Sequence, residues 1–283
     1  MAGSRTAVLA IAVANVLAVA ACNSDRAYAP PDTVLTDRQV STDIAQSEGL
    51  AMAADLESLD GAAIMTGVNF SIQATPAGGI RENVMPSAST ANCTFGSGRW
   101  SCISVVENGI TTVRSYAFYD AAGQPMYALD NLKTASVNFQ FSMNGAFSRD
   151  STFWGVLHRS RNVTVSGLLG AEISRRWDGF GVSADTNTHK DALSTRRYAG
   201  KSVDSVKAVV YPQPRTPGSF PLSGSTIRVV GYTVTSTGRS TETRSVDRRV
   251  VTTYNGTASA RIQSGSVTCT LHLDTHKVDS CSG

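Results

Sequence analysis

Hydrophobic and polar residues alternate through much of the chain after about residue 90, and the clearest stretch is 134–143. Because successive side chains of a β-strand point to opposite faces of a sheet, this pattern predicts a strand with one buried and one solvated face. The dipeptide Asn144-Gly145 follows and is typical of a hairpin turn, so we expect the strand to end there. The apolar positions of this strand are Ala135, Val137, Phe139, Phe141 and Met143.

A second alternation lies at 267–273, where the apolar residues are separated by Thr and His. A hairpin turn at Ser264-Gly265 would bring this strand against the preceding one with apolar residues facing each other. The facing pairs would be Ile262 with Val267 and Ala260 with Cys269.

The preceding hairpin, around Asn255-Gly256, allows two registers. A two-residue turn sets Tyr254 opposite Thr257, whereas a three-residue loop sets Tyr254 opposite Ala258. The Asn-Gly pair favours the first register and the burial of apolar residues favours the second, so the sequence leaves both open.

Regularly spaced strands without intervening helical patterns predict a mainly β fold over 91–283. An antiparallel meander fits this spacing, closed as a barrel, curved as a half-barrel or stacked as a sandwich. Further strands are predicted near 110–119, 151–158, 162–168, 204–211 and 226–236.

The segment before this β domain has a different pattern. Residues 22–35 are polar and contain two adjacent prolines, which is typical of an extended tether. Thr36 and Gln39 form a capping-box sequence, and apolar residues at helical spacing follow within 36–60. Because Gly49 weakens the middle of this segment, we expect one or two short helices there. Residues 61–90 contain Gly and Pro and are predicted to be a linker.

The first 21 residues have the three parts of a signal peptide. Arg5 gives a positive start, and an apolar run follows that is shorter than the roughly 20 residues needed to span a bilayer. The run ends in Val19-Ala20-Ala21-Cys22.

This ending resembles the lipobox of bacterial lipoprotein precursors: an aliphatic residue, two small residues and a cysteine. The resemblance implies cleavage before Cys22, acylation of Cys22 and attachment to a membrane of the bacterial cell envelope. Two or three acyl chains give durable anchoring, where one chain gives only marginal binding. Asn23 is not the aspartate that resembles an inner-membrane retention signal, so an outer membrane is expected. Cleavage after Ala18-Val19-Ala20, which would release a soluble protein, is the alternative.

The remaining four cysteines are an even number, which in an exported protein favours disulfide bonds. A turn at Ser97-Gly98 sets Cys93 opposite Cys102 and Phe95 opposite Trp100 on one face of a hairpin. The other pair is then Cys269 with Cys281, although strand parity there puts Val278 and Cys281 on opposite faces. The rival interpretation, a metal site, lacks a C-x-x-C spacing.

Charge is distributed unevenly. Residues 22–60 carry two arginines and eight acidic residues, whereas 61–283 carry 22 basic and 14 acidic residues. A basic β domain favours anionic lipid or glycan partners, and the alternative is an ordinary solvated surface. Nothing in the sequence indicates a nucleic-acid partner.

No sequence motif of a nucleophile, phosphate loop or dinucleotide site is present, so neither an enzyme nor a cofactor is predicted. The four histidines are His158, His189, His272 and His276. On a strand, His272 and His276 would lie roughly 13 Å apart, and no third ligand stands at a suitable spacing, so no metal site is predicted. Trp154 is expected in the core, Trp177 remains open, and the glycines at 179 and 181 are expected in a loop.

These features predict a membrane-anchored cell-envelope lipoprotein with a β-rich binding or structural domain. One alternative is a lipid carrier with the curved sheet and covering helix of lipocalin-like or lipoprotein-carrier-like proteins. The other alternative is a secreted hydrolase. A deep apolar cavity would favour the carrier, and a Ser-His pair or clustered acids lining a pocket would favour the hydrolase.

Overall fold

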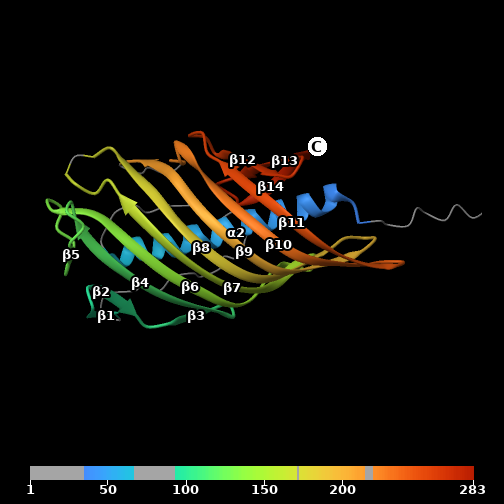
Figure 1. Ribbon diagram of the computed structural model, residues 1–283, viewed down its shortest axis with the longest axis horizontal. Coiled ribbons are helices and arrows are strands. Elements are labelled where there is room, and N and C mark those ends of the chain that lie inside the picture. The colour runs from blue at the N-terminus through green and yellow to red at the C-terminus, as the bar shows by residue number, and fades with distance from the viewer. Residues whose placement is uncertain (1–34, 67–92, 171, 214–218) are drawn as a thin grey trace, which may run out of the picture. The chain divides into compact units, whose positions relative to one another are not determined.

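The computed structural model describes residues 35–66, 93–170, 172–213 and 219–283, which form one helix and one antiparallel sheet (Figure 1). The predicted signal peptide, Cys22, the predicted tether up to residue 34 and residues 67–92 lie outside this description. The elements are α2 (Asp37–Thr66), β1 (Cys93–Gly96), β2 (Arg99–Cys102), β3 (Val105–Glu107), β4 (Ile110–Asp120), β5 (Pro125–Met126), β6 (Thr134–Asp150), β7 (Phe153–Ser166), β8 (Ser174–Lys190), β9 (Thr195–Pro212), β10 (Ser223–Thr237), β11 (Thr241–Thr253), β12 (Ser259–Ser264), β13 (Val267–His272) and β14 (Lys277–Ser282).

The sheet is an open antiparallel meander, which confirms the predicted fold class. From β6 to β14 each strand pairs with the next one in sequence, and β4 pairs with β2, β3, β5 and β6. Among the described strands β1 and β14 are the two ends of the order and do not pair with each other. The sheet curves around α2 (Figure 1), so the half-barrel is the correct one of the three predicted shapes.

The long strands run past the predicted boundaries. Asn144-Gly145 is not a turn, because Gly145 pairs with Ile110 of β4 on one side and Leu157 of β7 on the other. Ladders on both sides therefore extend β6 through a sequence that is typical of a hairpin turn. For the same reason the strands predicted at 151–158 and 162–168 are one strand, β7. The predicted buried face of β6 is confirmed at Val137, Phe139, Phe141 and Met143.

Both predicted registers near the carboxyl terminus are corrected. In the β12–β13 hairpin Ile262 pairs with Cys269, two positions from the prediction, so the same residues still point to the core. Between β11 and β12 Thr252 pairs with Ile262, which neither predicted register allows. The connection is longer because the Asn255 side chain accepts a hydrogen bond from the Thr257 backbone N–H, at 3.1 Å, and forms a wider loop.

The helix begins as predicted and continues further than predicted. Thr36 N–H donates to Gln39 Oε1 at 3.0 Å, and Gln39 N–H donates to Thr36 Oγ1 at 3.1 Å, which is the capping box. Gly49 does not break the helix. A Cβ at Gly49 would lie 2.7 Å from Val278 Cγ2, so this glycine lets α2 pack closely against β14. The predicted one or two short helices are thus one helix that extends to Thr66, into the expected linker.

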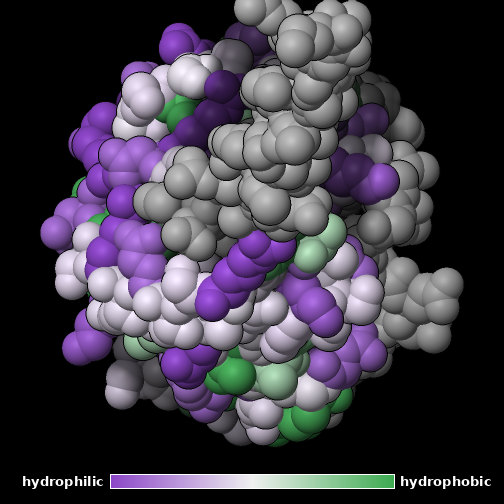
Figure 2. All heavy atoms as spheres, turned by 90° about the vertical axis from the view of Figure 1, so that its right-hand side faces the viewer, coloured by the Kyte–Doolittle hydropathy of each residue, from purple (hydrophilic) through white to green (hydrophobic). Residues whose placement is uncertain are grey.

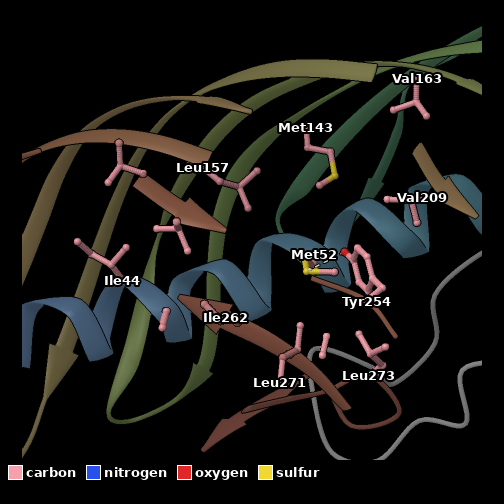
Figure 3. Packing of buried hydrophobic residues seen from close by; sticks show 14 of the residues in the cluster. Ile44, Met52, Met143, Leu157, Val163, Val209, Tyr254, Ile262, Leu271 and Leu273 are labelled. Atoms are coloured by element: carbon pink, nitrogen blue, oxygen red, sulfur yellow. Dashed lines mark hydrogen bonds between the residues drawn. The ribbon is translucent and has the colours of Figure 1, made fainter. Parts of the chain in front are cut away.

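The hydrophobic core lies between α2 and the inner face of the sheet. Figure 3 shows Met52 of α2 in this cluster with Tyr254, Ile262 and Leu271. The prediction that Trp154 lies in the core is wrong, because its side chain is 36% exposed on the outer face. Trp177, which the sequence left open, is 3% exposed, and its ring centroid lies 4.7 Å from that of Tyr211. The expected loop around Gly179 and Gly181 is part of β8, where it pairs with β7 and β9.

Candidate functional site

All four cysteines in the described residues form disulfides. Cys93 bonds to Cys102 in the predicted register, with Phe95 facing Trp100 at 5.3 Å between ring centroids. Ser97 and Gly98 both have positive φ, at 51° and 75°, as a tight hairpin turn of two residues requires. The chain has five cysteines, so these two bonds leave Cys22 as the odd one.

The Cys269–Cys281 bond is also present, and a bulge resolves its poor strand parity. The register shifts between Thr268 and Thr270, where Ser280 has a positive φ of 49°. An extra residue in β14 reverses which face the following side chain points to. Cys281 therefore reaches the buried Cys269 although Val278 also faces inward.

The main polar feature of the interior is a cluster that we call the charged interface. It comprises three acids of α2 and the charged inner-face residues of β7 to β10 that they meet. In the described residues these groups are all buried except Asp55, which is partly exposed. The members are Asp43, Glu48 and Asp55 on α2, Arg159 and Arg161 on β7, Asp185 on β8, Arg196 and Asp204 on β9, and Arg228 on β10.

Arg228 is the centre of this interface. Its Nη2 donates to Asp185 Oδ2 at 2.7 Å, and its Nε lies 3.4 Å from Asp204 Oδ1. Its Nη1 lies 3.5 Å from Glu48 Oε2, which connects the sheet to the helix. Its Nε and Nη2 also donate to the hydroxyls of Ser202 and Ser183. One guanidinium thus contacts acids from three elements, which defines the position of α2 against the sheet.

Two further arginines connect β7 to the helix. Arg161 bridges Asp55 Oδ2 at 2.9 Å and Asp204 Oδ2 at 2.8 Å. Arg159 donates to the backbone carbonyl of Ala51 in α2 at 2.9 Å. Burial, together with the neighbouring Arg161, lowers the pKa of Arg159. Burial raises the pKa of Glu48 in spite of Arg228, so the protonated form of Glu48 is favoured relative to a carboxyl in water.

The amino-terminal part of α2 contributes Asp43 to a second group of contacts. Arg196 donates to both carboxylate oxygens of Asp43, at 2.7 and 3.2 Å, and the Tyr198 hydroxyl donates to Asp43 Oδ2 at 2.6 Å. His189 Nδ1 lies 3.7 Å from Asp43 Oδ1, and its ring stacks on Phe153 at 4.3 Å. Burial lowers the pKa of His189 to about 4.

Ser47, His189 and Asp43 together have the order of groups found in a hydrolase triad, with Ser47 Oγ 3.3 Å from His189 Nε2. The contacts do not support nucleophilic chemistry. The Ser47 hydroxyl donates to the Asp43 backbone carbonyl at 3.0 Å, and Asp43 is already bound by Arg196 and Tyr198. A catalytic base works best with a pKa near the operating pH, and burial holds the pKa of His189 well below neutrality. The three residues fit a structural contact between helix and sheet.

The outer face of the sheet carries a hollow of about 360 Å³ over β4, β6, β7 and β8. Its outward-facing residues form two adjacent cross-strand rows. One row is Val113, Ser142, Ser160 and Val182, and the other is Ser115, Gln140, Asn162 and Phe180. Phe180 is 60% exposed, although an aromatic ring of this size is ordinarily buried.

A second hollow, of about 530 Å³, lies where the start of α2 meets β11 and the β12–β13 turn. Asp37 lines it and pairs with Arg244 at 3.0 Å and Arg248 at 3.3 Å. Figure 2 views the molecule from the right-hand side of Figure 1, and hydrophilic residues predominate among its coloured atoms. These ion pairs are solvent-exposed and hold the beginning of the helix against β11.

The charged interface was not predicted from the sequence, although the sequence contains a signal for it. Arg159 and Arg161 occupy the same alternate positions as Leu157 and Val163, and Arg228 alternates in phase with Val230. Charged residues on the apolar phase of a strand indicate buried charge that needs partners. Of the four histidines, only His189 is buried, and it lies beside Asp43 of the charged interface.

The described residues therefore form an open antiparallel half-barrel that curves around α2, and buried ion pairs join this helix to the sheet. Within them no three His, Cys, Asp or Glu side chains gather as a metal site. No helix in the described part of the chain is long and apolar enough to cross a membrane. Comparison of the chain with family models, with curated proteins and with solved structures found no match.

Proposed function

We propose that this protein is a lipoprotein of the bacterial cell envelope, anchored through acyl chains on Cys22, whose half-barrel is a binding domain. The observation that carries the proposal is the cysteine pairing. The other four cysteines bond to each other, so Cys22 has no cysteine left as a partner, and it stands where a lipobox requires it. An outer membrane is the proposed location.

Two disulfides in one domain support an exported protein, because such bonds persist in oxidising compartments and are rare in the cytosol. A binding role is preferred to catalysis because Ser47 and His189 are held in contacts between α2 and the sheet. A carrier of lipids would use the interior of the half-barrel for its ligand. Here α2 occupies that interior, with Met52 in the apolar core.

Anionic lipid or glycan remains a proposed partner for the basic β domain. Part of the positive charge lies inside, because Arg159, Arg161, Arg196 and Arg228 are buried against acids. Exposed basic residues such as Lys201 and Arg249 remain on the outer face. Binding through these residues would weaken as salt rises, since exposed charges are screened over about 8 Å at physiological salt.

The test of the anchor replaces Cys22 with Ser in the full chain expressed in a bacterial host. We expect loss of incorporated radiolabelled palmitate, with the protein present either as unprocessed precursor or as a soluble form that moves from the detergent phase to the aqueous phase. Ser24→Ala, two residues further along, is the matched control and should leave both properties unchanged. Undiminished palmitate labelling of the Cys22→Ser variant would overturn the proposal.

A further inference from the structure

We infer that the outer-face hollow over β4, β6, β7 and β8 is a binding site for a neutral saccharide. The two rows that line it cross four neighbouring strands. Strands in a sheet lie about 4.8 Å apart, so the hollow extends roughly 14 Å from Val113 to Val182. Its volume of about 360 Å³ lies at the lower end of the range for ligand sites, which is about 300–1,000 Å³.

The chemistry of the lining matches a sugar ring. A pyranose has hydroxyls around its rim and C–H groups on its faces, so it needs both hydrogen-bonding and apolar partners. The floor has the hydroxyls of Ser142 and Ser160, which face each other across β6 and β7, and the neighbouring row adds the amides of Gln140 and Asn162. Each of these groups both donates and accepts hydrogen bonds, as a sugar hydroxyl does.

Phe180 supplies the apolar surface. Its ring is 60% exposed, and Val182, two residues further along β8, is 52% exposed on the same side. Val113 is 44% exposed at the opposite end of the row. An exposed aromatic ring beside hydroxyl and amide groups is an amphipathic surface on which a C–H face can stack.

The lining also indicates a ligand without charge. Of the described residues around the hollow, only Arg114 and Arg161 are ionisable, and both are buried with their side chains on the inner face. Arg161 is held there by Asp55 and Asp204. An ionic ligand would find no exposed charged side chain among the residues that line the hollow. Beside it, the guanidinium of Arg99 already donates to Ser115 Oγ at 3.3 Å and to Asn138 Oδ1.

The hollow is supported from inside by the charged interface. Gly181 lies between Phe180 and Val182, and a Cβ at this position would overlap the guanidinium of Arg161. The Arg161 side chain therefore fills the space on the inner side of the β8 backbone and supports this backbone beneath the hollow. Ligand sites with a rigid supporting layer lose less entropy on binding.

The inference is tested with the full-length acylated protein in a detergent that has no sugar headgroup. Cellotetraose and tetra-N-acetylchitotetraose are titrated by isothermal calorimetry up to about 10 mM. We expect saturable binding of at least one oligosaccharide. Affinity should stay within about twofold when salt rises from about 0.05 M to about 0.5 M, because no ion pair is formed.

Two substitutions should weaken this binding by about tenfold or more. Phe180→Ala removes the stacking surface, and Ser160→Leu fills the floor of the hollow without altering the core. The control is Trp154→Ala, which removes an outward-facing aromatic ring on β7 that does not line the hollow. This variant should bind the oligosaccharide as the wild type does. Intact disulfides and an unchanged thermal midpoint establish that each variant is folded.

Absence of saturable binding by the wild type, or wild-type affinity in both hollow variants, would overturn the inference. Binding that collapses at high salt would also overturn it, because the ligand would then be held by charge. Palmitate labelling at Cys22 is measured separately, so a failed saccharide test leaves the membrane anchor standing.

Discussion

The two sides of α2 are buried by different means. The side toward β7–β10 carries Asp43, Glu48 and Asp55, which meet arginines of the sheet. The other side includes Gly49, which lies against Val278 and Leu271. It also includes Met52, whose sulfur accepts a hydrogen bond from the Tyr254 hydroxyl, with 3.5 Å between sulfur and oxygen. A helix in a soluble protein ordinarily has one buried stripe and one solvated face. Here both sides are covered.

The difference between these sides suggests that one stabilises the fold and the other determines where the helix lies. Close apolar packing contributes favourable free energy wherever atoms fit, and it tolerates alternative arrangements of similar volume. Buried ion pairs contribute little net free energy, because desolvation offsets their attraction, but a misplaced charge is costly. We therefore expect the side packed on β12–β14 to stabilise α2 and the charged interface to define its position and rotation.

The largest effect is expected at the centre of the charged interface. Arg228→Met leaves Asp185 buried without its closest partner and removes one of the two arginines beside Asp204, so the free energy of unfolding should fall by about 3–5 kcal/mol. Urea denaturation measures it. The control is Arg249→Met, an outward-facing change on β11 that should stay within about 0.5 kcal/mol of the wild type. A loss below about 1 kcal/mol at Arg228 would mean that the ion pairs do not define the position of α2.

Acid should weaken the same side of the helix through His189. Burial lowers the pKa of His189 to about 4 from 6.5, so the unfolded chain binds the proton first as pH falls. The contribution is therefore complete above pH 6.5 and is lost between pH 6.5 and pH 4, about 3 kcal/mol in all. His189→Asn should flatten that part of the curve of unfolding free energy against pH. His158→Asn removes a histidine from the outer face and is the control. Equal slopes for the wild type and His189→Asn would contradict the prediction.

A smaller effect is expected on the packed side. Gly49→Ala gains about 1 kcal/mol of helix propensity but forces a Cβ to 2.7 Å from Val278 Cγ2, so a net loss of about 1–2 kcal/mol is expected. Val278→Ala makes room for the new methyl group. In that background Gly49→Ala should be neutral or stabilising, which a double-mutant cycle in thermal unfolding measures. Additive losses would show that Gly49 and Val278 do not limit each other.

The smallest effect is expected at Glu48. Because burial raises the pKa of Glu48, its contribution to stability is present below the unfolded value of 4.5 and is lost as pH rises through the folded value. Glu48→Gln resembles the protonated form and should change stability by less than about 1 kcal/mol. Its stability relative to the wild type should rise with pH. The contrasting variant is Asp204→Asn, which weakens the ion pairs with Arg161 and Arg228 and should lose more stability. Equal losses of unfolding free energy in Glu48→Gln and Asp204→Asn would contradict the prediction.

The sequence predicted those features that depend on neighbouring residues. The Thr36 and Gln39 capping box and the Ser97-Gly98 hairpin are both present, because turn and cap chemistry operates over a few residues. The register around Asn255 was wrong, since loop length there depends on the side-chain hydrogen bonds of Asn255. The register around Gly265 was wrong because the two turn residues are Gly265 and Ser266, with Gly265 at a positive φ of 60°. The ends of β6 and β7 were missed because pairing with neighbouring strands overrides local propensity.

The uneven charge was interpreted as a property of the surface, whereas much of it is internal. Acids of the amino-terminal segment, including Asp43 and Asp55, pair with arginines of the β domain. A sequence alone does not show that two segments of opposite charge meet. The outer-face hollow was not predicted either, because Ser142, Ser160 and Phe180 come together only through the register of β6, β7 and β8.

The distance in sequence between α2 and its partners has a consequence for how the chain folds. Consecutive strands of the meander can pair early in folding, because only short loops have to close. Glu48 and Arg228, in contrast, are 180 residues apart. Gly49 packs against Val278 of β14, which is the last of the described strands. Contacts of such long range slow folding because the entropy of closing the loop is lost before the contact forms. The first element of the described residues is therefore the last of them to be enclosed, and until then its acids stay in water.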